Sequence, residues 1–98
     1  MHHITLAQLR EWQAEGKPYQ LIDVREPEEH KYFNIGGELI PLGSILTATD
    51  RLASDRPVVV YCKRGIRSQI AIQRWAQWRP EVEFYNLTGG VYDMMTTA

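Results

Sequence analysis

Cys62 is the only cysteine in the chain, and the residues around it are of types that activate a thiol. The apolar residues 58–61 precede it and are typical of a buried strand. The next six residues contain three cations and a glycine, and the pattern from Ser68 onward predicts a helix. A thiol between the carboxyl end of a strand and the start of a helix lies where α/β proteins commonly carry out their chemistry.

Residues 62–68, which we call the cysteine loop, predict a binding site for an anion. Gly65 permits a tight turn, so that backbone N–H groups of the loop and of the following helix point into one concavity. Free cysteine has a pKa of about 8.5, which helix N-termini and nearby cations lower to about 3.5–7.5. We therefore expect Cys62 to be a nucleophilic thiolate, in a cradle that also suits the charged end of a persulfide.

An inert cysteine is the alternative, because a single cysteine after a strand is commonly a small buried hydrophobe. The cations and the glycine beside Cys62 favour a reactive site, since a packed core position needs neither. Lys63 and Arg64, each taken alone, fit a solvated surface as well as they fit a substrate site.

The composition indicates one soluble globular domain, residues 1–98, with 44% hydrophobic and 23% charged residues. The net charge of −1 gives no overall attraction to nucleic acid or to an anionic membrane. With one cysteine there is no intrachain disulfide, and whatever the thiol picks up must pass to another molecule. The N-terminal residues lack the apolar core of a signal peptide, and no apolar run reaches the ~20 residues of a membrane span, so we expect a cytoplasmic protein.

Helices and strands alternate along the chain, which predicts a parallel α/β sheet with right-handed crossovers. A capping box at Thr5 and Gln8 starts the first helix, and the others are expected to start near Glu26, Ser44 and Ser68. Strands are expected at residues 20–24, 58–61 and 82–87, with a loop at 36–44, a turn at 89–90 and at most a helical turn at 91–95. The helix after Ser68 is expected to present Ala71, Trp75 and Trp78 on one face.

The cysteine loop resembles the active-site loop of rhodanese-type sulfurtransferases, whose pattern is Cys-x-x-Gly-x-Arg-Ser. Three more segments follow the family's order: residues 21–26 resemble its Asp-Val-Arg signature, 36–41 its loop before an Ile-Pro pair, and 87–90 its Gly-Gly turn. The match covers nearly the whole chain. It departs from the family at Gly36-Gly37, where histidine and alanine are frequent, and at Met94, where many members have tryptophan.

This resemblance implies an α/β, rhodanese-like fold with a central, mostly parallel sheet flanked by helices on both faces. It implies a thiosulfate sulfurtransferase in which Cys62 takes sulfane sulfur from thiosulfate or a persulfide donor and passes it to cyanide or a thiol. The substrate-binding residues would be Lys63, Arg64, Gly65, Ile66, Arg67 and Ser68. The expected partners are a small anionic sulfur donor and a thiol or protein acceptor, with a monomer favoured.

Neither a metal nor an organic cofactor is needed for this chemistry, and His2, His3 and His30 lack ligand spacing and are expected to be surface residues. Asp23 and Arg25 match the family signature, and we interpret them as structural residues near the site that form an ion pair. The alternative for Arg25 is a place at the border of the pocket.

Two other functions are compatible with a reactive cysteine. A phosphatase of the Cys-x5-Arg type needs arginine six positions after the cysteine, but Ser68 stands there and Arg67 comes one residue too soon. A sulfur carrier without turnover, or a regulatory protein-interaction module, is the non-enzymatic alternative. Formation of thiocyanate from thiosulfate and cyanide separates the enzyme from the carrier.

Overall fold

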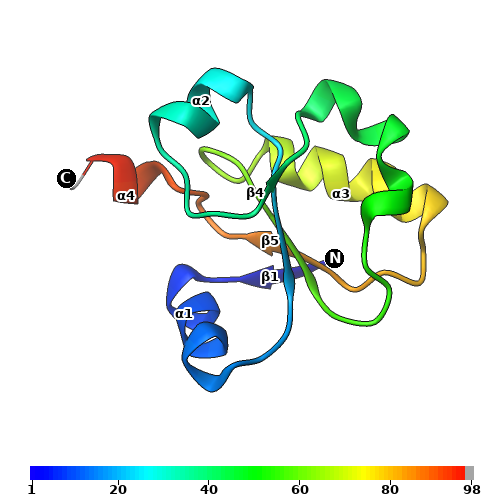
Figure 1. Cartoon of the computed structure of the whole chain (residues 1–98), viewed down its shortest axis with the longest axis horizontal. Helices are drawn as coiled ribbons and strands as arrows, with labels where there is room; N and C mark the ends of the chain where they lie inside the picture. The colour runs from blue at the N-terminus through cyan, green and yellow to red at the C-terminus, as the bar shows by residue number, and fades with distance from the viewer. Residues whose placement is uncertain (97–98) are drawn as a thin grey trace.

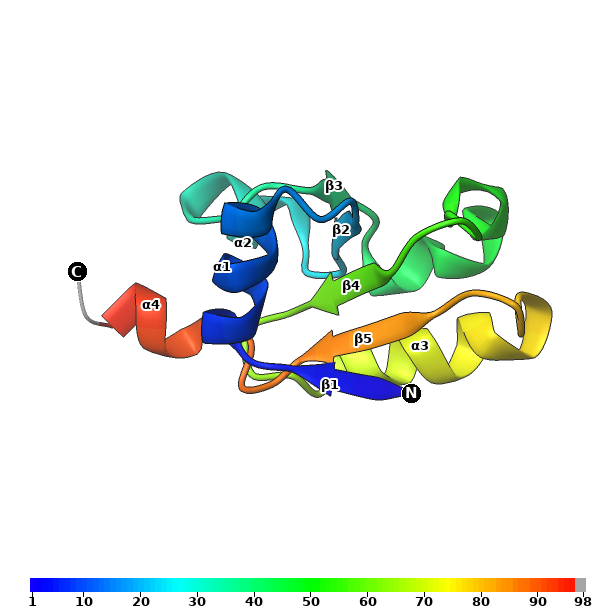
Figure 2. The same ribbon diagram turned by 90° about the horizontal axis from the view of Figure 1, so that it is seen from below.

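The computed structural model describes residues 1–96, and its five strands form one parallel sheet (Figure 1). The strands are β1 (His2–Ile4), β2 (Gln20–Asp23), β3 (Glu38–Leu39), β4 (Val58–Tyr61) and β5 (Phe84–Leu87). Their order in the sheet is β1-β5-β4-β2-β3, which Figure 2 shows from one edge to the other. The strand before the cysteine loop, β4, is therefore the central one.

Within residues 1–96, three helices and two 3-10 helices connect the strands, and a fourth helix follows β5. The helices are α1 (Leu6–Glu15), α2 (Pro27–Tyr32), α3 (Arg67–Trp78) and α4 (Tyr92–Thr96), and the 3-10 helices are η1 (Leu42–Thr47) and η2 (Thr49–Arg51). In the described part of the chain, none of the helices is both long and apolar enough to cross a membrane.

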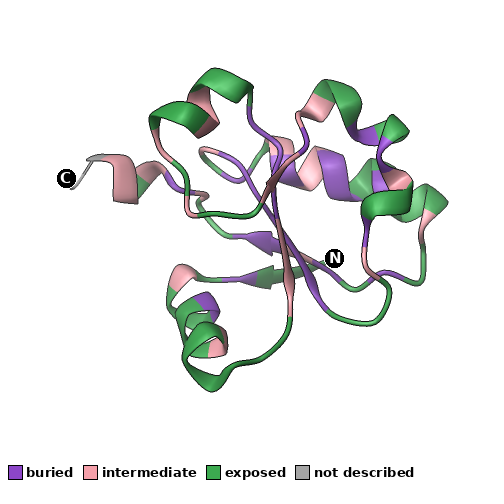
Figure 3. Cartoon of the chain, viewed as in Figure 1, coloured by how far each residue is buried: buried purple, intermediate pink, exposed green. Residues whose placement is uncertain are grey.

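Strand β4 is buried on both faces, as Figure 3 shows. Val58 and Val60 belong to the apolar cluster that includes Trp75 of α3, and the next residue on this side is Cys62. Val59, between them, belongs to the cluster on the opposite face, which includes residues of α1 and β5. A strand buried in this way reads as a continuous apolar run, which is why the sequence located it correctly.

The register of the sheet places the carboxyl ends of three neighbouring strands, β5, β4 and β2, side by side. Asp23 of β2 lies opposite Tyr61 of β4, and Val60 lies opposite Asn86 of β5. Because the strands are parallel, the residues that follow β2, β4 and β5 lie side by side at their carboxyl ends. This edge is where ligands bind in open α/β sheets.

The predicted start of α1 is confirmed. The Thr5 hydroxyl accepts the Gln8 N–H at 3.1 Å, and the Gln8 side chain accepts the Thr5 N–H at 2.9 Å. Gly16 ends the helix with φ of 70°, in the left-handed region that favours glycine. The strand at 58–61, the helix after the cysteine loop and the turn of helix at the end of the described chain are also confirmed.

Three expectations are wrong in detail. The short edge strands β1 and β3 were not predicted, and β3 lies within the expected loop at 36–44. The helix expected from Ser44 is replaced by η1 and η2, and Ser44 lies inside η1 without capping it. Ile45 in η1 and Ala48 directly after it are buried and three apart, a spacing that suits a 3-10 helix as well as an α-helix. Trp78 is 65% exposed, because the last turn of α3 extends past the apolar cluster.

Candidate active site

The cysteine loop connects the end of β4 to the start of α3, and Gly65 allows its turn. Gly65 has φ of 88°, and a Cβ there would lie 3.3 Å from the backbone nitrogen of Gly89. An L side chain is therefore strained at this position both by the backbone conformation and by the close approach of another segment.

The Gly-Gly turn after β5 holds the backbone of the cysteine itself. The Val91 N–H donates to the Cys62 carbonyl at 3.1 Å, and the Tyr92 N–H donates to the Lys63 carbonyl at 2.9 Å. A Cβ at Gly90 would overlap these two carbonyl oxygens. The turn at 89–90 is thus needed for the close contact between the β5 end and the cysteine loop.

The sulfur of Cys62 is surrounded by hydrogen-bond donors. The Gly65 N–H donates to Sγ at 3.1 Å, the Ser68 N–H at 3.4 Å, and the Ser68 hydroxyl lies 3.4 Å away. Burial of the thiol, which is 1% exposed, raises its pKa, but the hydrogen bonds from Ser68, Gly65 and Arg64 outweigh burial and hold the pKa of Cys62 below its usual value. The cradle predicted from the sequence is therefore present.

An open pocket of about 330 Å³ lies over the cysteine loop. Its lining consists of Cys62, Lys63, Arg64, Ile66 and Arg67. Ile66 is 64% exposed and gives the cationic rim an apolar point. A second hollow, of about 410 Å³, lies between α3 and the amino end of β5, where Ile72, Val82 and Phe84 line it, and it does not include the cysteine.

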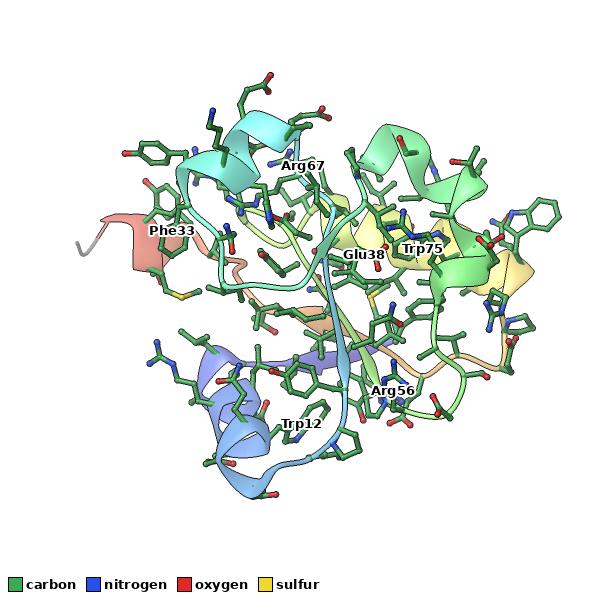
Figure 4. All side chains as sticks on the ribbon, viewed as in Figure 1. Trp12, Phe33, Glu38, Arg56, Arg67 and Trp75 are labelled. Atoms are coloured by element: carbon green, nitrogen blue, oxygen red, sulfur yellow. The ribbon has the colours of Figure 1, made fainter. Side chains whose placement is uncertain are left out.

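The three loop cations are not equivalent. Arg67 makes two parallel hydrogen bonds to the Glu29 carboxylate of α2, at 2.7 and 2.9 Å, and Figure 4 shows Arg67 beside this helix. These bonds lower the pKa of Glu29 to about 2. The Arg64 guanidinium lies 4.1 Å from the ring centre of Tyr92, and the Lys63 ammonium 5.8 Å from it. Arg67 therefore braces α2 against the loop, and the other two cations lie over an aromatic ring.

Asp23 and Arg25 form the ion pair expected from the sequence. The Arg25 guanidinium donates to both carboxylate oxygens of Asp23, at 2.9 and 2.8 Å, and to the Phe33 carbonyl at 2.6 Å. Both side chains are fully buried, and neither lines the pocket over the cysteine loop. Burial raises the pKa of Asp23, but hydrogen bonds from Arg25 and His30 outweigh it and lower the pKa.

His30 was expected at the surface, and the structure instead pairs it with Asp23. Its Nδ1 lies 2.8 Å from an Asp23 oxygen, because the short helix α2 returns the chain over the end of β2. Within residues 1–96, the structure contains no group of three histidine, cysteine or acidic side chains placed to hold a metal ion.

A buried polar network behind the sulfur was missed by sequence reasoning. The Ser68 hydroxyl donates to the side-chain oxygen of Asn86 at 2.5 Å, and the Asn86 amide nitrogen lies 3.5 Å from Nδ1 of His3. Asn86 is 2% exposed. The available signal was an amide in the middle of an apolar strand, because a buried amide requires hydrogen-bond partners.

Residues 5–96 match the family model of the rhodanese-like domain. The chain belongs to the rhodanese-like domain family. It is 42% identical over 72 residues to MoeZ of Mycobacterium tuberculosis, named a probable adenylyltransferase/sulfurtransferase, a match that covers 70% of this chain and 18% of MoeZ. It is 38% identical over 81 residues to YqhL of Bacillus subtilis, covering 82% of this chain and 64% of YqhL. The rhodanese-like chain thus spans less than two thirds of the length of either relative.

The fold agrees with solved structures of similar size. The crystal structure of SSP1007 from Staphylococcus saprophyticus superposes with a TM-score of 0.84 at 30% identity, covering 95% of this chain and 92% of that one. The predicted rhodanese-like α/β fold is confirmed, and the sheet is parallel throughout residues 1–96.

Proposed function

We propose that this protein is a sulfurtransferase that carries sulfane sulfur as a persulfide on Cys62. The observation that supports this most strongly is that the Cys62 sulfur accepts hydrogen bonds from backbone N–H groups of the cysteine loop, and that Cys62 lines an open pocket. The relative MoeZ carries a sulfurtransferase name, which supports the same chemistry.

In the first half-reaction, the Cys62 thiolate attacks the outer sulfur of thiosulfate. A new S–S bond forms on the cysteine, the S–S bond of thiosulfate breaks, and sulfite leaves with the bonding electron pair. In the second half-reaction, cyanide or a thiolate attacks the outer sulfur of the persulfide, and the Cys62 thiolate is the leaving group. Charge balances in both steps without a cofactor, and the cycle is ping-pong covalent catalysis.

The pocket residues have separate roles in this proposal. Lys63 and Arg64 attract the anionic donor, because both are cationic and both line the pocket. The backbone N–H groups of Gly65 and Ser68 stabilise the thiolate that accepts and releases sulfur. Arg67, held by Glu29, fixes the start of α3 and with it the Ser68 N–H.

A phosphatase is less well supported by the same geometry. Phosphate transfer needs an arginine fork that holds the equatorial oxygens of the phosphoryl group. The fork of Arg67 is directed to the two oxygens of Glu29, and Ser68, at the position where the arginine is needed, bonds to Asn86.

The test follows thiocyanate formed from thiosulfate and cyanide, with Cys62→Ser as the matched control. We expect wild-type protein to form thiocyanate and the variant to form none. Loading of sulfur on Cys62 without thiocyanate would identify a carrier that serves a protein acceptor. Absence of both signals, together with hydrolysis of p-nitrophenyl phosphate, would contradict sulfur transfer. The cytoplasmic location, the monomeric state and the small anionic donor stay predictions.

A further inference from the structure

Three polar side chains lie in a row behind the Cys62 sulfur, on the side away from the pocket. The Ser68 hydroxyl is 3.4 Å from Sγ and donates to the Asn86 side-chain oxygen at 2.5 Å. The Asn86 amide nitrogen is 3.5 Å from Nδ1 of His3 on β1. Ser68 and Asn86 are buried and do not line the pocket, so this row is an internal network.

The hydroxyl of Ser68 has one proton, and two neighbours compete for it. When Cys62 is a thiol, its S–H donates to Ser68 and the Ser68 O–H donates to the Asn86 oxygen, so every group is satisfied. A thiolate can only accept. With the amide oriented as in the structure, the Ser68 lone pairs then face the anion and its proton points to Asn86. This arrangement leaves a buried anion beside an acceptor.

The competition disappears if the amide is reversed. A half-turn about the last side-chain bond of an asparagine exchanges its oxygen and its NH2 group in nearly the same space. The Asn86 nitrogen then donates to the Ser68 oxygen, and the Ser68 O–H donates to the thiolate. The Asn86 oxygen faces Nδ1 of His3, which carries a proton in one of the two tautomers of the neutral ring.

We propose that the side-chain amide of Asn86 reverses when Cys62 loses its proton, so that Ser68 is bonded to the sulfur in both states. Asn86 is thus a positioning residue that acts through Ser68. The inference rests on the proposed function only in that the thiolate is the form that reacts, and it is tested without sulfur transfer.

Several charged or ionisable groups surround this network, and their effects on the titration must be distinguished from that of Cys62. His3 contacts the amide from β1, whereas Lys63, Arg64 and Arg67 lie on the pocket side of the sulfur, with Glu29 of α2 on Arg67. The variant His3→Gln keeps a donor and an acceptor near the amide without the imidazole ring, and it serves as the control for the histidine.

The direct test is a pH titration of the side-chain amide resonances by ¹⁵N NMR, compared with the pH dependence of Cys62 alkylation by iodoacetamide. We expect the Asn86 resonances to move with the same midpoint as alkylation, in wild type and in His3→Gln. Asn34 is the only other asparagine, and its exposed amide donates to the His30 carbonyl, so its resonances should not follow that midpoint. Asn86 resonances that stay fixed, or that move equally in Cys62→Ser, would overturn the proposal.

Substitutions provide a second test. Asn86→Asp supplies only acceptors and so keeps the Ser68 proton away from the sulfur. We expect the apparent pKa of alkylation to rise by about one unit or more, which is about tenfold slower alkylation below that pKa. In a Ser68→Ala background, Asn86→Asp should raise the apparent pKa of alkylation by less than about half as much, because only the charge of the new carboxylate then acts on the sulfur. Equal shifts in both backgrounds would overturn the proposal.

The two tests do not depend on each other or on turnover. If Asn86→Asp does not fold, the wild-type titration still decides. If the Asn86 resonances follow the alkylation midpoint but the protein forms neither persulfide nor thiocyanate, the amide reversal stands and the proposed function is wrong. If the protein transfers sulfur but the Asn86 resonances stay fixed, the proposed function stands and the amide reversal is wrong.

Discussion

The ends of β2 and β4 lie side by side in the sheet, and both carry buried polar side chains. After β2, the Arg25 side chain donates two hydrogen bonds to the Asp23 carboxylate, and neither residue lines the pocket over the cysteine loop. After β4, the N–H groups of Gly65 and Ser68 both donate to the sulfur of Cys62, a residue that lines an open pocket. At the end of β2, two full charges form a buried ion pair that stabilises the fold. At the end of β4, neutral N–H groups instead donate to the sulfur of Cys62.

This difference shows how a structural polar group is told from a reactive one at the same edge of a sheet. Both groups have perturbed pKa values, since the pKa of Asp23 and that of Cys62 are each lowered by hydrogen bonds that outweigh burial. The perturbation alone therefore does not identify the active site. The two ends differ in their surroundings, because Cys62 lines the pocket over the cysteine loop and Asp23 does not.

Breaking the ion pair at the end of β2 should have the largest effect, and it should fall on stability. Asp23→Ala leaves the Arg25 charge buried without a carboxylate, which costs about 3–5 kcal/mol in the free energy of unfolding measured in urea. The double variant Asp23→Ala with Arg25→Met removes both charges and should lose less. Equal losses of unfolding free energy in the two variants, or a loss below about 1 kcal/mol in Asp23→Ala, would contradict a stabilising role of the Asp23–Arg25 ion pair.

Disturbing the end of β4 should affect transfer more than stability. Gly90→Ala places a Cβ against the carbonyl oxygens of Cys62 and Lys63 and must displace the cysteine loop. We expect a loss of about 10- to 100-fold in thiocyanate formation. Gly89→Ala is the matched control, because it has a similar positive φ but its Cβ meets nothing within 4 Å. Transfer reduced equally by both variants would show that backbone strain, and not loop displacement, causes the loss.

Glu29→Gln should have a smaller effect, because it changes the charge at the rim. Arg67 and Glu29 are each about a third exposed, and such pairs contribute about 0–1 kcal/mol to stability. Without the carboxylate, Arg67 adds positive charge to the pocket, so KM for thiosulfate should fall about two- to fivefold. Glu28→Gln, on the exposed side of the same turn, is the control. A rise in KM would show instead that the brace, and not the charge, governs donor binding.

The acid dependence of stability should show the smallest effect. The pKa of Glu29 is about 2 in the folded protein against an ordinary value of 4.5, so its contribution is fully present above pH 4.5 and is lost as the pH falls through about 2. The free energies of unfolding of wild type and Glu29→Gln, measured in urea between pH 4.5 and about 2, should converge as the pH falls. A constant difference between the two proteins would contradict the ionised pair.

The cysteine loop was predictable from sequence because its parts are local. The apolar strand, the glycine of the turn and the start of α3 follow one another within about a dozen residues, and each has its own signal. The Asp23–Arg25 pair was predictable for the same reason, since its members are two residues apart.

The contacts that finish the site are not local. Glu29 and Arg67 are separated by 38 positions, and Ser68 and Asn86 by 18. Nothing near Arg67 in the sequence indicates that a carboxylate takes its charge. The edge strands β1 and β3 have three and two residues, which is too short for an alternating pattern, and they exist because a neighbouring strand pairs with them.

The central claim is that the end of β4 carries sulfur, and the mass of Cys62 after exposure to thiosulfate tests it most directly. We predict one added sulfur atom on the peptide that contains Cys62, removed by cyanide with formation of thiocyanate, and no added sulfur on Cys62→Ser. Wild-type protein whose Cys62 alkylates rapidly near neutral pH, yet gains no sulfur from thiosulfate or from a persulfide donor, would contradict the account.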